Sequence, residues 1–205
     1  FSFELFEDLV GPSPFREIDL VEVPLRSAAG VEFSGLILVG SQYTQDPRDL
    51  FFSIIISHEM AHQWFYAAIG NDVSEHPWLD ESFATYLSYE FLDAYYQEAT
   101  ANGQLTTWQA AYQAALRDWE SLSISSPRYA FPNSSIYSSF VYSGGAVFLY
   151  DLRQELGDEA FYRGLQTYYS SMLYAMASPD DYVRIIEESC ACQIDELLSI
   201  YRIMP

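Results

Sequence analysis

Two kinds of hydrophobic pattern follow one another along the chain. Before residue 46, two short strand-like runs, 18–24 and 31–39, flank the turn-prone segment 27–30 (S-A-A-G). From residue 47 onward, apolar residues recur at the spacing of amphipathic helices. The predicted helices are 47–69, 79–100, 105–122, 140–156 and 159–172, followed by two shorter ones after Pro179 and Gln193. The pattern predicts an α+β, mostly helical domain with a small β lobe (1–46) and a helical lobe (47–205).

Other features of the sequence predict a long loop and indicate that no segment is long and apolar enough to span a membrane. Residues 121–139 are rich in Ser, Pro and Asn, which predicts a loop that lines a cleft or is mobile. The longest apolar run, 50–56, is far shorter than the roughly 20 residues of a membrane-spanning helix, so no membrane span is expected. Because the chain begins at Phe1 without an initiator Met or a leader, we interpret it as a fragment or processed form whose cellular compartment is unknown.

The charge of the chain excludes one class of partner. The formal net charge is −20, from 29 acidic residues against nine arginines and no lysine. Such a surface repels nucleic acid and anionic lipid, and it tolerates cationic ligands such as the protonated amino terminus of a peptide. The alternative interpretation is that the acidic surface only keeps the protein soluble and has no role in ligand binding.

The two cysteines, Cys190 and Cys192, lie one residue apart in a predicted helical region. Two thiols cannot form a four-ligand structural zinc site, and this spacing strains a mutual disulfide. We therefore expect both to be incidental thiols.

The strongest chemical signal is the sequence H-E-M-A-H at 58–62, within the first long predicted helix. Positions i and i+4 lie on the same helix face, so His58 and His62 can converge on one zinc ion. Glu59 then projects toward the coordination position that would hold water. The alternative is a pair of core or interface histidines beside a surface glutamate.

A catalytic zinc site needs a third protein ligand. A metzincin would carry a third histidine at position 68 and a glycine at position 65, but Ala68 and Phe65 stand there. Glu81 opens the next predicted helix, and a short loop between two antiparallel helices would bring it to the histidine face. His76, in the connecting loop, is the weaker alternative. The predicted metal ligands are therefore His58, His62 and Glu81.

These motifs and two further segments resemble one peptidase family. H-E-x-x-H followed after eighteen residues by Glu within W-L-D-E is the signature of gluzincins similar to aminopeptidase N and leukotriene hydrolase. Residues 29–36 (A-G-V-E-F-S-G-L) resemble the exopeptidase strand of this family, and 142–146 (Y-S-G-G-A) resemble its Y-x-K-G-A helix start. The resemblance runs from about residue 14 to the end and implies a thermolysin-like catalytic domain with one Zn²⁺.

The resemblance also implies roles for individual residues. Glu32 matches the glutamate that binds the free α-amino group of the substrate, and Gly30 belongs to the same substrate-binding strand. Tyr142 matches the tyrosine whose hydroxyl stabilises the oxyanion. Without the motif, Glu32 would be read as an exposed strand carboxylate and Tyr142 as a core residue. Asp80 would orient a histidine ligand or cap its helix.

The chain also departs from the family pattern. Phe33, Gly144 and Ser82 stand where relatives carry Asn, Lys and Gly. The large β domain that precedes this region in relatives and the helical array that follows it are missing, although both help to close the cleft. Flanking domains of a longer chain are therefore possible partners.

The expected function is zinc-dependent hydrolysis of peptide bonds, with Glu59 as the base and Tyr142 as the oxyanion donor. If Glu32 binds a free amino terminus, the enzyme is an aminopeptidase acting on peptides. The alternatives are an endopeptidase or an epoxide-type hydrolase on the same fold, and a non-catalytic peptide-binding module. The preferred side chain and the oligomeric state cannot be predicted.

Overall fold

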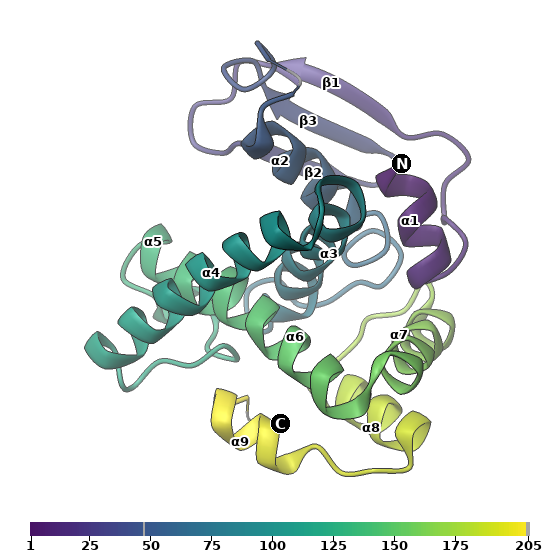
Figure 1. Ribbon diagram of the computed structural model, residues 1–205, viewed down its shortest axis with the longest axis vertical. Helices are drawn as coiled ribbons and strands as arrows, with labels where there is room; N and C mark the ends of the chain where they lie inside the picture. The colour runs from purple at the N-terminus through teal and green to yellow at the C-terminus, as the bar shows by residue number, and fades with distance from the viewer. Residues whose placement is uncertain (47, 204–205) are drawn as a thin grey trace.

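The computed structural model describes residues 1–46 and 48–203, so residue 47, where the first long helix was predicted to begin, lies outside the described residues, as do 204 and 205. One small sheet packs on one end of a helical body (Figure 1). Its strands are β1 (Asp19–Val23), β2 (Gly30–Phe33) and β3 (Leu36–Gly40), in the order β1-β3-β2. β1 runs parallel to β3, and β2 runs antiparallel to it.

The predicted single strand at 31–39 is wrong, because the chain turns at its middle. Phe33 pairs with Leu36, and Gly35 between them has a φ of +72°, which glycine adopts without steric cost. The run is therefore a hairpin of β2 and β3. Ile37 and Val39 of β3 are buried against Ile55, so alternate residues of this strand attach the sheet to the first long helix.

A short helix at the start of the chain was not predicted. α1 (Ser2–Leu9) buries Phe6 completely against Trp64, and the indole N–H of Trp64 donates to the carbonyl of Gly11 at 2.8 Å. Burying a side chain of this size contributes about 1.5–3 kcal/mol. α1 is thus anchored on the helical body although it precedes the sheet in the sequence.

Two antiparallel helices form the centre of the molecule. α2 (Leu50–Ala61) begins at Asp49, whose carboxylate accepts from the backbone N–H groups of Phe51 and Phe52. α3 (Trp78–Tyr96) is buried over most of its length, with neighbours on several sides (Figure 1). Its first turns join an aromatic cluster in which Phe83 stacks on Phe65 with ring centroids 4.6 Å apart.

The first long helix ends earlier than predicted. α2 stops at Ala61 rather than at residue 69, because Tyr66 takes a φ of +127° and its N–H donates to the carbonyl of Ile69. The segment 62–69 folds into a compact loop, closed by a hydrogen bond from Ala67 N–H to the carbonyl of His62.

The rest of the chain wraps α3 with helices and one irregular segment. The predicted loop 121–139 contains a 3₁₀ turn and a short helix, and the predicted helix 140–156 starts inside a π-helix. The remaining elements are α4 (Glu98–Asp118), η1 (Arg128–Ala130), α5 (Ser134–Tyr137), the π-helix η2 (Ser138–Gly144), α6 (Gly145–Leu156), α7 (Asp158–Met172), α8 (Pro179–Cys190) and α9 (Asp195–Tyr201).

The expectation of two incidental thiols is wrong: Cys190 and Cys192 form a disulfide. α8 ends at Cys190, and Ala191 takes the left-handed conformation with a φ of +52°. The chain reverses there, and the two Cα atoms come to 5.2 Å.

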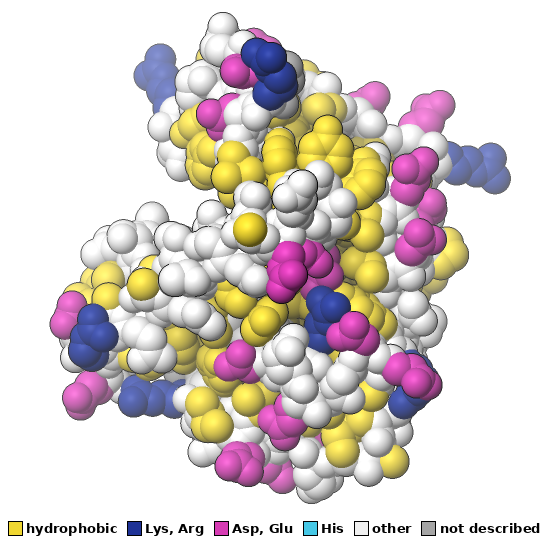
Figure 2. Space-filling model, in the orientation of Figure 1, with side chains coloured by type: hydrophobic (Ala, Val, Ile, Leu, Met, Phe, Trp, Pro, Cys, Tyr) yellow, Lys and Arg dark blue, Asp and Glu magenta, His cyan; other side chains and the backbone are white. Residues whose placement is uncertain are grey.

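Within residues 1–46 and 48–203, no helix combines the length and apolar character needed to cross a bilayer. Acidic side chains are scattered over the face shown in Figure 2, with few basic ones between them. The same view is hollowed between the part that carries the strands and the arm of α4 and α5.

Candidate metal centre

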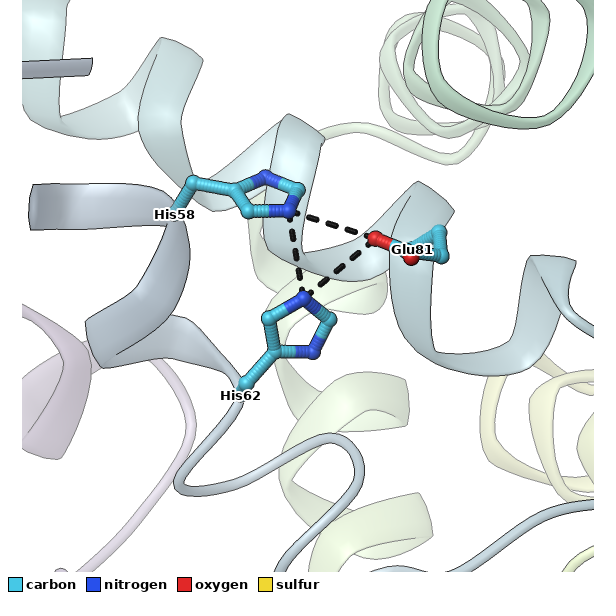
Figure 3. A group of neighbouring side chains, drawn as sticks. All are labelled: His58, His62 and Glu81. Carbon is cyan, nitrogen blue, oxygen red and sulfur yellow. Dashed lines mark hydrogen bonds and ion pairs between the residues drawn. The ribbon is translucent and has the colours of Figure 1, made fainter. Parts of the chain in front are cut away.

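Three side chains from α2, the loop after it and α3 point toward one another (Figure 3). His58 Nε2 lies 3.2 Å and His62 Nε2 3.3 Å from Glu81 Oε2, and the two Nε2 atoms are 3.1 Å apart. His58 lies in the last turn of α2 and His62 directly after its end, whereas Glu81 lies in the first turn of α3. One helical turn separates the histidines, as the H-E-x-x-H spacing requires.

This donor set fits a tetrahedral zinc ion. Bonds of about 2.0–2.1 Å to nitrogen and oxygen give tetrahedral edges of about 3.3 Å, close to the three separations above. Two imidazoles and one carboxylate are also ligand types of catalytic zinc sites, which leave a fourth position for water or substrate.

A backbone hydrogen bond orients the imidazole of His62, and a ring contact orients that of His58. His62 is 1% exposed, and its Nδ1–H donates to the carbonyl of Phe65 at 3.0 Å, which leaves the Nε2 lone pair free for a metal. This contact depends on the compact loop that ends α2 early. The His58 ring stacks on the ring of Tyr142, with centroids 5.5 Å apart.

The charges of the side chains around the predicted metal position favour the binding of a cation. Burial would raise the pKa of Glu81, but its hydrogen bonds with His58 and His62 outweigh burial and hold the pKa well below its usual range. Burial would likewise keep His62 neutral, but the hydrogen bond and the charge of Glu81 raise its pKa to about 10. The negative charge that draws a proton to His62 would equally hold a divalent metal ion.

Glu59 lies beside this centre and is tightly enclosed. It is 7% exposed, burial raises its pKa, and its Oε2 has no hydrogen-bond partner among the described residues. Gly30 of β2 packs directly on it, because a Cβ at Gly30 would lie 2.4 Å from Glu59 Oε1. A buried carboxylate with one unpaired oxygen and a raised pKa is suited to accept a proton.

Glu32 reaches the same place from the middle of β2. Ligand atoms of Glu32, Glu59 and His62 all lie within 4.8 Å of one another. A second carboxylate therefore stands next to the predicted base, where it could bind an ammonium group.

Tyr142 contacts two of the predicted metal ligands, Glu81 and His58. Its hydroxyl donates to Glu81 Oε1, the oxygen that does not face the histidines. Burial and the charge of Glu81 raise the pKa of this hydroxyl well above its ordinary value, so it stays protonated and remains a donor. Tyr142 lies in the π-helix η2, a form of helix that often occurs at functional sites.

A hydrogen bond ties η2 to the start of α3. Ser82, which follows Glu81, donates from its hydroxyl to the carbonyl of Val141 at 2.9 Å. A Cβ at Gly145 would lie 1.8 Å from this hydroxyl oxygen, so the contact requires glycine there. The sequence marked Ser82 only as a departure from the family pattern.

The other two candidates, His76 and Asp80, do not belong to the ligand set. His76 belongs to neither of the two clusters of metal-ligating groups found within residues 1–46 and 48–203. Asp80 is buried, and its carboxylate accepts from the backbone N–H of Glu81 rather than from a histidine. Burial and the charge of Glu81 raise the pKa of Asp80 to about 7.

A cavity of about 430 Å³ opens on this centre. Its walls come from the loop before β2, from α2 and α3, and from the region 128–143. Trp108, Arg128 and Tyr137 also line it. No motif marks them in the sequence, because they lie on a helix face and in a segment without a recognisable pattern.

Comparisons with known proteins point to one family. The model of the peptidase family M1 domain matches residues 3–201. Aminopeptidase M1-D of Oryza sativa subsp. japonica is 28% identical over an alignment of 202 residues that covers 93% of this chain and 23% of that protein. A probable aminopeptidase 1 of Sulfurisphaera tokodaii is 25% identical, over 92% of this chain and 25% of its own length.

Solved structures agree with the fold. An M1 zinc metallopeptidase of Deinococcus radiodurans bound to a Tyr-Ser-Ala substrate superposes with a TM-score of 0.78 at 22% identity, covering 100% of this chain and 44% of that one. Yeast LTA4 hydrolase in complex with bestatin gives a TM-score of 0.81 at 17% identity, over 96% of this chain and 32% of that one. The chain thus spans about a quarter of the length of the curated relatives it matches.

Proposed function

Since the chain belongs to peptidase family M1, we propose that it is the zinc-binding catalytic part of an aminopeptidase, an enzyme that removes amino-terminal residues from peptides. The observation that carries the proposal is the convergence of His58, His62 and Glu81 beside the buried carboxylate of Glu59. The aminopeptidase names of the relatives support the choice of substrate.

In this proposal, His58, His62 and Glu81 hold one zinc ion. When bound, the ion supplies Lewis-acid polarisation of the scissile carbonyl and lowers the pKa of water. Glu59 accepts a proton from the attacking water and passes it to the nitrogen of the leaving amine. Its raised pKa brings it closer to neutral pH, where it can both take and return that proton.

Two further side chains position the peptide. The hydroxyl of Tyr142, beside Glu81, donates a hydrogen bond to the carbonyl oxygen as negative charge develops on it. Glu32 binds the free α-ammonium group, because its carboxylate lies next to Glu59 and His62 on the substrate side of the cavity.

The competing functions on this site are an endopeptidase, an epoxide-type hydrolase and a non-catalytic peptide-binding module. The position of Glu32 favours the aminopeptidase over these, because a carboxylate within 4.8 Å of the base limits the room for a chain that extends past the amino terminus. Intact ligands, base and tyrosine argue against a non-catalytic module.

Steady-state kinetics on one peptide with a free and an acetylated amino terminus tests this assignment. Glu32→Ala should raise KM strongly for the free peptide, because the lost ion pair forms on binding. Tyr142→Phe should lower kcat by about 100-fold with little change in KM, because its bond strengthens in the transition state. Efficient cleavage of the acetylated peptide by the unmodified protein would refute the aminopeptidase assignment in favour of an endopeptidase.

A further inference from the structure

One arginine lines a cavity that also carries three carboxylates. Glu32, Glu59 and Glu81 lie in its walls beside the two histidines, and Arg128 is the one arginine or lysine among the described residues that line it. The whole chain has nine arginines against 29 acidic residues, so a basic group at the substrate cavity stands out against the overall charge.

Arg128 has no carboxylate partner within the described part of the chain. The ion pairs found there engage Arg48, Arg153, Arg163 and Arg184. Arg128 instead places its guanidinium carbon 4.0 Å from the centre of the Tyr137 ring. That contact holds the plane of the guanidinium while leaving its N–H donors free for an anion.

The backbone also fixes Arg128. Its N–H donates to the carbonyl of Ser74 at 2.8 Å, and it begins the 3₁₀ turn η1. A side chain anchored at its backbone and stacked on a ring loses less freedom when it binds a ligand than a solvated arginine would.

Aromatic rings connect Arg128 to the metal ligands. Tyr137 packs edge-on against Tyr142 with ring centroids 5.6 Å apart, and Tyr142 stacks on His58 at 5.5 Å. The guanidinium is therefore within the reach of a short peptide whose scissile bond lies at the metal ligands. Glu32 enters the same cavity from β2.

We propose that Arg128 binds a carboxylate of the peptide substrate and makes the enzyme selective for peptides that carry one close to the cleaved bond. This inference rests on the proposed peptidase function. The carboxylate can come from an acidic side chain in the first two residues or from the carboxy terminus of a short peptide. Both present the same planar pair of oxygens to the guanidinium fork.

The kinetic experiment compares peptides that differ in one charge. Ala-Ala-Ala against its carboxy-terminal amide reports the terminal carboxylate. Amidated tripeptides with Glu or Gln in the first or second position report an acidic side chain. For one of these pairs, the acid form should have a kcat/KM about 10- to 100-fold higher than the neutral form, the range expected for a hydrogen-bonded ion pair.

Variants assign this preference to Arg128. Arg128→Gln should abolish it, and Arg128→Lys should retain part of it, because the charge remains but the fork is lost. Arg117→Gln is the matched control: it removes the same charge from an exposed position outside the cavity and should leave the preference intact. Circular dichroism shows whether Arg128→Gln retains its fold.

Measuring peptide affinity distinguishes a failure of this inference from a failure of the proposed function. Titration calorimetry with the same peptides, in a Glu59→Gln background that does not consume them, measures affinity without turnover. A carboxylate preference in binding that is lost in Arg128→Gln supports the inference even if no peptide is hydrolysed, in which case the proposed function alone fails. Equal affinity for acid and neutral forms, no binding of any peptide, or loss of the preference in Arg117→Gln would overturn the inference.

Discussion

At the scale of single residues, the absence of a side chain at position 30 shapes the candidate site. The backbone of β2 lies directly on the Glu59 carboxylate, and a methyl group at Gly30 would lie 2.4 Å from Glu59 Oε1. The glycine thus restricts the Glu59 carboxylate, whose Oε2 has no hydrogen-bond partner within the part of the chain that the structure describes. The family resemblance assigned Gly30 to substrate binding, and we propose that its contact with Glu59, the proposed base, gives it a second role.

We expect Gly30→Ala to lower kcat about 10- to 100-fold while zinc content stays unchanged, because the added methyl displaces the base by a fraction of an ångström or more. Gly103→Ala is the control, since a Cβ there meets nothing within 4 Å. That substitution lies in α4 and should raise stability by up to about 1 kcal/mol without changing kcat. Full activity in Gly30→Ala would show that the close contact does not position Glu59.

At the scale of elements, side-chain hydrogen bonds join α3 to the π-helix η2 at the candidate site. α3 supplies Glu81, η2 supplies Tyr142, and the hydroxyl of Ser82 joins them through the carbonyl of Val141. In a π-helix the hydrogen bonds shift by one residue, so the N–H of Gly145 donates to the carbonyl of Phe140, five residues back. The Ser82 bond therefore helps to fix the register that places Tyr142 on Glu81.

Ser82→Ala removes only this hydroxyl from a fully buried position. We expect the free energy of unfolding to fall by about 1 kcal/mol and kcat to fall several-fold with KM nearly constant, because the role proposed for Tyr142 is to stabilise the transition state. Ser189→Ala removes a bond within α8, to the carbonyl of Ile185, and should leave kcat unchanged. A loss of stability in Ser82→Ala without any loss of kcat would show that Ser82 has only a structural role.

The elements also show what the sequence could and could not predict. The positions of His58 and His62 follow from helical spacing, and Glu81 follows from its place in the first turn of the next helix; both are local properties. The turn at Gly35, the early end of α2 at Ala61 and the disulfide of Cys190 with Cys192 depend on single residues in left-handed or other positive-φ conformations. Two of these residues, Tyr66 and Ala191, are not glycine. Hydrophobic periodicity carries no information on such residues.

At the scale of the whole molecule, the net charge and the proposed flanking domains determine how the site would work. We propose that the chain acts as two parts, 1–46 and 47–205, which meet at the cavity, and that flanking domains of a longer chain close it. The net charge of −20 would draw the ammonium end of a peptide toward Glu32, while Arg128 would select its carboxylate. Both attractions should weaken as ionic strength rises.

The most direct test of the account is the zinc content per chain, measured together with kcat, in the unmodified protein, Glu59→Gln and Glu81→Ala. We predict one zinc per chain in the unmodified protein and in Glu59→Gln, with kcat reduced by about 100- to 10,000-fold in the variant, because the amide cannot accept the proton. Glu81→Ala should lose the metal. Near-full activity in Glu59→Gln, or one zinc per chain in Glu81→Ala, would contradict the assignment of base and ligands.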